Sequence, residues 1–362
     1  MANDKSKYDV IIIGGGPAGI ATSLTLTARG FSNCIVEARY EPINKPGEAI
    51  PPNAKPLLEK LGLTYIVNDS KHSQYYGNKS CWGTNKLEQK EFIRDVYGPG
   101  FLLDRLYFES QLRRHVRKYG GSLLIGYKLK EIISKDRVIT VSVDNGENVK
   151  TLHGSYIVDA TGRKASVANQ FGGNKRKLDE QFALTFKVKL ECSIQRQITV
   201  EATENGWWYA APQGESELIV MFFTIKKIVP KKEQIPMFLK KELESSFHIS
   251  LLLDIALMDF NQIKMMPAGT SRLDIPYGDN WLAVGDAAYS YDPISSYGIT
   301  SSLASGFYGG HAIASALNNK KDAMDSYLYL METTFHQYME KKIAYYSEER
   351  RWIDSPYWKS VV

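Results

Sequence analysis

Short apolar runs recur along the chain and predict buried strands. Residues 8–13, 34–37 and 281–284 are continuous and rich in β-branched or other large apolar side chains. Strands that are apolar on both faces are typical of a parallel sheet covered on both sides. Between the first two runs, residues 20–29 have helical character and Gly30 closes the helix. The chain therefore begins with a strand–helix–strand unit.

The pattern changes between residues 178 and 224. Apolar and polar positions alternate there in short runs separated by turn residues. This period of two predicts an antiparallel sheet with one buried face, an arrangement that commonly covers a pocket. Further strands are predicted at residues 123–129, 138–143 and 156–159, and helices from residue 105 to about 119, at 299–318 and across 322–352.

The composition argues against a nucleic-acid-binding protein, a metal site, a disulfide framework and a membrane span. The chain is 43% hydrophobic and 23% charged, as a folded globular protein is. Its net charge of +5 is spread out, and basic clusters such as 175–177 and 226–232 are interpreted as solvated surface, so no nucleic-acid partner is expected. Cys34, Cys81 and Cys192 lie far apart, which predicts no zinc or other metal site, no disulfide framework and a reducing, cytoplasmic setting. No apolar run approaches the roughly 18 residues of a membrane span.

Three glycines between the first strand and its helix predict a dinucleotide site. Gly14 permits the tight turn, Gly16 lets the backbone approach a pyrophosphate, and Gly19 allows the helix to pack on the strand. The helix N-terminus supplies free N–H groups to the phosphates, and Glu37 at the end of the second strand is placed to bind ribose hydroxyls. The cofactor contacts predicted here are Gly14, Gly16, Pro17, Ala18, Gly19, Glu37, Ala38 and Arg39.

A second glycine-rich element distinguishes FAD from NAD. Gly285 and Asp286, followed by Pro293 and Gly298, resemble the second FAD motif of the flavoprotein monooxygenases and halogenases. The resemblance implies that Asp286 contacts the ribityl chain and that the helix opening near Gly298 points at the flavin ring, where it would stabilise negative charge. The chain has no second fingerprint for a nicotinamide. Electrons for the non-covalently bound FAD would therefore come from NAD(P)H held at another surface or from a separate flavin reductase.

Other segments extend this resemblance over nearly the whole chain. Arg105 looks like the arginine that reaches the FAD phosphates, residues 159–163 look like the loop over the adenosine end, and residues 47–51 resemble the Gly-Glu-Ser segment beside the isoalloxazine, with Ala49 in place of Ser. The cofactor residues that the resemblance implies are Glu48, Ala49, Arg105, Ala160, Thr161, Gly162, Gly285, Asp286, Pro293, Gly298 and Ile299.

These features together predict an α/β fold. We expect a Rossmann-like FAD-binding domain with a parallel sheet, interleaved with an antiparallel-sheet substrate domain and followed by a helical C-terminus. The FAD-binding domain would comprise residues 1–65, 101–170 and 273–320, the substrate domain residues 66–100 and 171–272, and the C-terminal segment residues 321–362.

Within this superfamily the chain looks most like the tryptophan-halogenase-like flavoproteins, with altered signatures. The Trp-x-Trp-x-Ile-Pro pattern falls on residues 207–212, where Tyr209 and Ala211 replace the second Trp and the Ile. The Phe-x-x-Pro-x-x-Ser-x-Gly pattern falls on residues 290–298 and begins with Ser290. The position of the halogenating lysine holds Tyr75, and Lys79 lies nearer to the anchoring Trp82. The candidates for lining the flavin and substrate pocket are Tyr75, Lys79, Trp82, Trp207, Tyr209, Pro293 and Ser296.

These departures favour oxygenation over halogenation. We expect an FAD-dependent monooxygenase that uses reduced flavin and O2 to hydroxylate an aromatic substrate. The alternatives are a flavin-dependent halogenase of an indole or pyrrole, in which Lys79 would act, a prenyl-lipid reductase, and a non-enzymatic flavin-binding partner. No histidine or other side chain is identified as a general base.

A narrower resemblance concerns three segments. Residues 206–212, 292–296 and 349–358 look like the short flavoproteins that mature tryptophylquinone cofactors in lysine and glycine oxidases. This resemblance implies a precursor protein as the partner and one of its tryptophan side chains as the substrate. Packing is the competing explanation of Trp207, Trp208 and Tyr209, because neighbours on a strand point to opposite faces and at least one must face away from a pocket.

Overall fold

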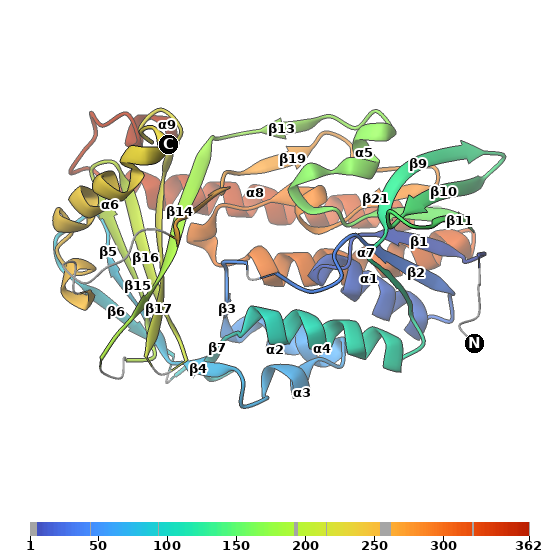
Figure 1. The fold of residues 1–362 in the computed structure, drawn as a ribbon, viewed down its shortest axis with the longest axis horizontal. Coiled ribbons are helices and arrows are strands. Elements are labelled where there is room, and N and C mark those ends of the chain that lie inside the picture. Colours follow the sequence, from blue (N-terminus) through green and yellow to red (C-terminus); the bar gives the residue numbers. More distant parts are fainter. Residues whose placement is uncertain are drawn as a thin grey trace.

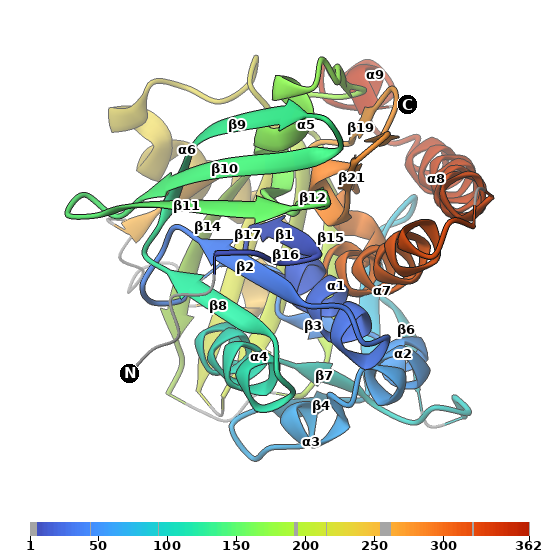
Figure 2. The same ribbon diagram turned by 90° about the vertical axis from the view of Figure 1, so that its right-hand side faces the viewer.

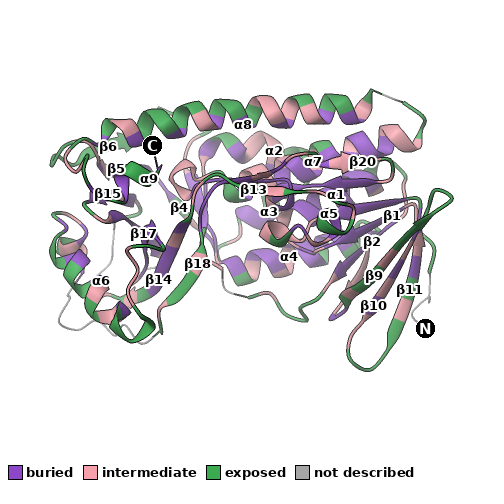
Figure 3. Cartoon of the chain, turned by 90° about the horizontal axis from the view of Figure 1, so that it is seen from above, coloured by how far each residue is buried: buried purple, intermediate pink, exposed green. Residues whose placement is uncertain are grey.

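The computed structural model describes residues 6–43, 45–92, 94–191, 195–214, 216–253, 262–320 and 322–361. Figure 1 shows two units side by side, one built on a parallel sheet with helices and the other on a broad second sheet. The long helix α8 (Ala323–Glu348) runs along both units, and Figure 3 shows its exposed positions on the outer side. Within the described ranges, no helix has the length and apolar character needed to cross a bilayer.

The first unit is centred on a six-stranded sheet in the order β20-β21-β12-β1-β2-β8. All neighbouring strands are parallel except β20, which runs antiparallel to β21. Every residue of the central strand β1 is buried, as its continuous apolar run predicts. The strands are β1 (Val10–Ile13), β2 (Asn33–Glu37), β8 (Ser122–Ile125), β12 (Tyr156–Asp159), β20 (Tyr277–Gly278) and β21 (Trp281–Ala283).

Both faces of this sheet are covered, which explains its buried strands. Figure 2 shows helices on one side and a three-stranded sheet, β11-β10-β9, on the other. Helices α1 and α7 approach closely, since a Cβ at Gly306 would lie 2.2 Å from the Ala18 carbonyl oxygen. These covering elements are α1 (Pro17–Ala28), α4 (Arg105–Lys118), α7 (Gly298–Leu317), β9 (Lys128–Lys135), β10 (Val138–Asp144) and β11 (Val149–Gly154).

The second unit contains a seven-stranded sheet in the order β18-β14-β17-β16-β15-β5-β6. The antiparallel prediction is correct for most of it, but β5 lies parallel to β15, because β5 comes from an earlier part of the chain and is not joined to β15 by a hairpin. One face packs on helix α6 (Ile235–Glu244). The strands are β5 (Gly77–Cys81), β6 (Glu88–Glu91), β14 (Gln181–Lys189), β15 (Ile198–Thr203), β16 (Gly206–Gln213), β17 (Glu217–Ile225) and β18 (Lys264–Pro267).

Smaller elements complete the two units and the junction between them. One three-stranded sheet has the order β3-β7-β4 and another the order β13-β19-β22. The strands are β3 (Ala49–Ile50), β4 (Ser73–Tyr75), β7 (Gly100–Leu102), β13 (Lys175–Lys177), β19 (Ser271–Leu273) and β22 (Tyr289–Ser290), and the short helices are α2 (Lys55–Lys60), α3 (Thr64–Val67), α5 (Ser166–Gln170) and α9 (Trp358–Val361).

Several element boundaries differ from the predictions. The predicted strand at 123–129 is two strands, β8 and β9, because Gly126 turns the chain with φ +85°. Helix α1 begins earlier than expected, at Pro17, since proline is well suited to the first helical position. Helix α8 ends at Glu348, short of the predicted residue 352. The helices predicted from residue 105 and at 299–318 are confirmed within one residue as α4 and α7.

Candidate functional site

Four of the predicted cofactor segments meet at one edge of the parallel sheet. Strands β1, β2, β12 and β21 run in the same direction, so their carboxyl ends share an edge. The residues that follow or end these strands are Gly14–Gly16, Glu37, 160–162 and Gly285 with Asp286. In open α/β sheets, ligands bind outside the carboxyl ends of the strands. The structure therefore brings together residues that lie far apart in the sequence.

The three glycines of the first turn have different surroundings. Gly14 has φ +113°, and a Cβ there would lie 2.2 Å from the Ala160 carbonyl oxygen. A Cβ on Gly19 would lie 2.0 Å from the Gly14 carbonyl oxygen. A Cβ on Gly16 would meet nothing within 4 Å, and its φ of −80° suits any residue. Gly14 and Gly19 thus serve packing, whereas Gly16 keeps an open backbone surface.

Two helix N-termini at this site are free to bind an anion. Neither α1 nor α7 has a side-chain cap or an acidic residue in its first turn. A Cβ on Gly162 or Gly298 would also meet nothing within 4 Å, so the backbone is open at both places. Uncapped N–H groups beside open glycines fit the phosphates and ring of a dinucleotide such as FAD.

Glu37 is held rigidly at the end of β2. Its Oε2 accepts from the Gly15 amide at 2.8 Å, and its Oε1 accepts from the Arg39 amide at 2.9 Å. Ala38 and Arg39 are exposed beside it. The carboxylate is therefore oriented by backbone amides next to the glycine turn, where it remains a predicted ribose contact.

Asp286 lies beside two cations. The Arg163 Nε is 3.5 Å from Asp286 Oδ2, and Lys175 donates to the Asp286 backbone carbonyl. Burial lowers the pKa of Lys175 to about 8. The interpretation of residues 175–177 as solvated surface is therefore wrong for Lys175, because the β13 strand turns this side chain inward. The Lys-Arg-Lys run itself carries no signal that singles out its first residue.

Arg105 and Glu48 lie at the junction between the two units. Arg105, 6% exposed, donates to the Gly47 carbonyl and to Glu109 Oε1, the latter at 2.7 Å. Glu48 is 1% exposed, and its Oε1 accepts from the Tyr209 hydroxyl at 3.2 Å. The Glu48 Oε2 and the Arg105 Nε are buried and have no hydrogen-bond partner among the described residues. Buried polar atoms without partners are rare, so a ligand is one explanation of both.

Glu48 should make stability depend on pH. Burial raises its pKa from 4.5 to about 6, opposed by the Tyr209 hydrogen bond, the Arg105 charge and the backbone amides of Gly47 and Glu48. A raised folded pKa means that the native protein holds this proton more tightly than the unfolded chain does. The free energy of unfolding should therefore fall as pH rises from about 4.5 to about 6, by about 2 kcal/mol for this group.

Comparing urea unfolding of the protein and of Glu48→Gln from about pH 4 to about pH 8 tests this expectation. The difference in unfolding free energy between the two should change by about 2 kcal/mol in favour of the variant as pH rises. Glu41→Gln, at an exposed position on the same segment, is the matched control. A constant difference across this range would contradict a raised pKa at Glu48.

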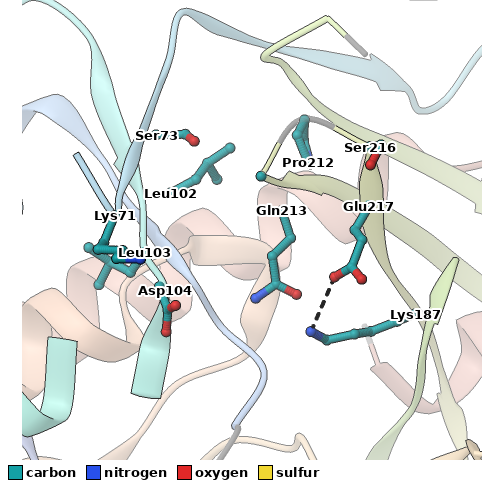
Figure 4. Close-up of a pocket in the computed structure, with 11 residues that line it drawn as sticks. Lys71, Ser73, Leu102, Leu103, Asp104, Lys187, Pro212, Gln213, Ser216 and Glu217 are labelled. Atoms are coloured by element: carbon teal, nitrogen blue, oxygen red, sulfur yellow. Dashed lines mark ion pairs between the residues drawn. The ribbon is translucent and has the colours of Figure 1, made fainter. Parts of the chain in front are cut away.

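A pocket of about 400 Å³ lies between the two units close to Glu48. Figure 4 shows side chains from the β7–α4 junction facing those of the β16–β17 hairpin, with Gln213 directed into the gap and Lys187 paired with Glu217 at 3.6 Å. The Gln213 Oε1 is another buried atom without a partner in the described parts of the chain. The lining residues are Lys71, Ser73, Leu102, Leu103, Asp104, Lys187, Pro212, Gln213, Gly214, Ser216 and Glu217.

The candidate pocket residues fall in different places. Tyr75, Trp207 and Tyr209 share one buried cluster on the face of the seven-stranded sheet that meets the first unit, and Trp82 packs beside it. Trp208 lies on the other face, with α6, as the strand period requires. Lys79 pairs in register with Thr199, which pairs with Ala210 of the α6-facing cluster. Residues paired across strands share a face, so Lys79 lies on the face opposite Tyr209.

Pro293 and Ser296 lie in the loop that leads into α7. Pro293 opens a short 3₁₀ turn, and Ser296 has φ +52° just before the helix begins. Asp292, which is fully buried, caps this turn by accepting from the Ile294 amide at 2.9 Å. The loop thus places both candidates next to the α7 N-terminus.

A buried ionic network anchors this loop, and the sequence reasoning missed it. Lys342 Nζ lies 2.5 Å from Asp179 Oδ2 and 3.7 Å from Asp292 Oδ2. The Tyr346 hydroxyl donates to Asp292 Oδ2 at 3.0 Å and accepts from the Trp207 Nε1 at 3.1 Å. Lys342 lies four residues after Tyr338 and four before Tyr346 on α8, and this helical spacing of buried residues was the available signal.

Across the ranges that the structure describes, no group of His, Cys, Asp and Glu could hold a metal ion. Cys34 and Cys81 are buried and free, and Cys192 lies outside the described residues.

Comparison with known proteins agrees with this geometry. A protein-family model described as "FAD binding domain" matches residues 7–336. The "Putative FAD-dependent oxidoreductase LodB" of Marinomonas mediterranea is 27% identical over 366 residues, which cover 97% of this chain and 96% of that protein.

Two solved structures show the same fold. The myxobacterial chondrochloren halogenase CndH superposes with a TM-score of 0.89 at 19% identity, covering 98% of this chain and 86% of that one. The peptidyl tryptophan dihydroxylase QhpG, essential for tryptophylquinone cofactor biogenesis, superposes with a TM-score of 0.80 at 21% identity, covering 98% and 78%. The α/β architecture predicted from the sequence is confirmed.

Proposed function

Since the chain belongs to the FAD binding domain family, we propose that it is a monooxygenase that uses reduced FAD and O2 to hydroxylate an aromatic substrate. The protein is an FAD-dependent oxidoreductase of the monooxygenase and halogenase group. The proposed substrate is a tryptophan side chain in a precursor protein. QhpG is named as a peptidyl tryptophan dihydroxylase, and its likeness to this chain supports the choice.

The position of Lys79 is the observation that best supports oxygenation over halogenation. Lys79 lies on the α6 side of the sheet, and its ammonium donates to Gln195 Oε1 at 2.6 Å near the surface. Tyr75, at the position of the halogenating lysine, is buried with Trp207 and Tyr209. A lysine on the opposite face of the sheet is poorly placed to act on a substrate in that cluster, which supports oxygenation.

In the proposed mechanism the bound flavin supplies the redox chemistry. Gly16, the N-terminus of α1 and Arg105 would hold its phosphates, and Glu37 would bind a ribose. Asp286 would bind the ribityl chain, and the N-terminus of α7 would face the ring and favour negative charge there. The buried aromatic cluster would exclude water and orient the substrate. The electrons would come from NAD(P)H or from a separate flavin reductase.

We also propose that residues 1–65, 101–170 and 273–320 form the FAD-binding domain, residues 66–100 and 171–272 the substrate domain, and residues 321–362 a C-terminal segment. In support, β5 and β6 from residues 66–100 join the strands from residues 171–272 in one sheet. The reducing, cytoplasmic setting stays a prediction that rests on the spacing of the cysteines.

Product mass decides between the candidate reactions. Reduced enzyme, O2 and a precursor protein carrying the target tryptophan should give a product heavier by one or two oxygen atoms, with or without chloride or bromide. An unchanged precursor mass would refute the oxygenase proposal. A halide-dependent mass would establish the halogenase, and saturation of a lipid without O2 the reductase.

Lys79→Ala should leave oxygenation within about twofold of the unmodified protein, because surface substitutions away from a site have small effects. The measurement is the initial rate of product formation, with the stability of the variant checked by thermal unfolding. Loss of activity in a stably folded variant would favour the halogenase, in which this lysine acts.

A further inference from the structure

The pocket and Glu48 share a wall. Leu102, which lines the pocket, pairs with Ala49, and the amide of Leu103, another lining residue, donates to the Glu48 carbonyl at 2.9 Å. Across the gap, Pro212 lines the pocket three residues after Tyr209 on the same strand. The two elements that form the pocket therefore also bring Glu48 and Tyr209 together.

The two oxygens of Glu48 differ in their contacts. Oε1 accepts from the Tyr209 hydroxyl, whereas Oε2 is buried without a partner in the described structure. The Arg105 charge lowers the pKa of this carboxyl, but the hydrogen bonds of its guanidinium go to the Gly47 carbonyl and to Glu109. A buried carboxylate oxygen without a hydrogen-bond donor is energetically costly. Oε2 is therefore available to accept a hydrogen bond from a bound ligand.

The surroundings of Glu48 restrict the kind of donor. The adjacent cluster contains Ala49, Tyr75, Leu102, Trp207 and Tyr209, all buried and mostly apolar. The neighbouring pocket is lined mainly by polar and charged side chains, so a ligand that reaches Glu48 would pack an apolar part against the buried cluster and present a donor to the carboxylate. Indole has this form, because its ring is apolar and its single N–H donates only.

We propose that Glu48 Oε2 accepts the ring N–H of a substrate indole and so selects it over aromatic rings without a donor. Tyr209 is a positioning residue that fixes the carboxylate through Oε1. This inference rests on the proposed function for the identity of the substrate. The flavin ring also carries an N–H, and the test must distinguish these two sources of a donor.

Binding to the FAD-loaded, oxidised protein provides that test without turnover. The probes are N-acetyltryptophanamide and its 1-methylindole analogue, titrated by flavin and tryptophan fluorescence. Methylation should weaken binding to the unmodified protein by about 10-fold or more, because it removes a hydrogen bond to a charged group. In Glu48→Gln the two probes should bind within about threefold of each other, because a neutral amide oxygen accepts a weaker hydrogen bond than a carboxylate does.

Two further variants test the arrangement. Tyr209→Phe should keep part of the preference for the N–H probe, since the Glu48 carboxylate is retained but is no longer held by a hydrogen bond to Oε1. Glu41→Gln, the exposed control, should keep all of it. The preference for the N–H probe over the methylated probe should also fall below about pH 6, where Glu48 gains a proton. Arg105 and Tyr209 are the charged and titratable groups that act on this carboxyl. Equal affinity of the unmodified protein for both probes, or no binding of either, would overturn the inference.

The affinity of Glu48→Gln for FAD distinguishes an indole N–H from the N–H of the flavin ring as the donor to Oε2. If Glu48→Gln weakens FAD binding and leaves the indole preference intact, Oε2 serves the flavin and the inference is wrong. A failed oxygenase assay together with a preserved indole preference would instead refute only the proposed reaction.

Discussion

Replacing Gly16 with alanine should weaken FAD binding by about 10- to 100-fold, which corresponds to an overpacking cost of about 1–3 kcal/mol. The added methyl group meets no protein atom within 4 Å, and the backbone φ of −80° accepts it without strain. It would therefore occupy the space in which the pyrophosphate is expected to approach the α1 N-terminus. The protein itself should remain as stable as before, or gain up to about 1 kcal/mol by losing a flexible glycine from the unfolded chain.

Titration of the flavin-free protein with FAD, together with urea unfolding of the same material, checks this separation of binding from stability. Gly19→Ala is the matched comparison in the same turn. Its methyl group would lie 2.0 Å from the Gly14 carbonyl oxygen, so it should destabilise the protein by about 3 kcal/mol or more. Unchanged FAD affinity in Gly16→Ala would show that the cofactor does not approach this backbone.

Replacing Lys342 with methionine should lower the free energy of unfolding by about 3–5 kcal/mol, because removal of one partner leaves buried charge uncompensated. The side chains of Lys342, Asp179 and Asp292 are 4%, 3% and 0% exposed. Burial already raises the pKa of Asp292. A group whose folded pKa is raised binds a proton more readily in the native state, so the loss should shrink as pH falls.

Thermal and urea unfolding of Lys342→Met, over a range of pH, measure this effect. Lys359→Met is the matched control, since its partner Asp354 is 93% exposed and such pairs change stability by less than about 0.5 kcal/mol. Adding Asp179→Asn to Lys342→Met should restore at least about 1 kcal/mol, because one of the two stranded charges is removed. Equal losses in Lys342→Met and Lys359→Met would show that the network contributes no more than a surface pair.

The site could be predicted in outline because its main signals are local. The open turn at Gly16 and the strand end at Glu37 depend on neighbours along the chain, and the period of two correctly separates Trp208 from Trp207 and Tyr209. The partners of these groups are not local. Nothing near Glu48 in the sequence indicates a hydrogen bond to Tyr209, 161 residues away.

By itself the sequence determined the strand–turn–helix unit, a site for a dinucleotide and the two kinds of sheet, because glycine conformation and the spacing of apolar side chains act over a few residues. The choice of FAD among the dinucleotides came from the family resemblance of the Gly285–Gly298 segment. Only the tertiary structure decided that Lys79 lies on the far face of the sheet, that Lys175 is turned toward Asp286, and that Lys342 joins Asp179 to Asp292. Burial and pairing of a charge depend on which distant segments pack around it. Strand register and helix packing set those neighbours, and they form only when the whole chain folds.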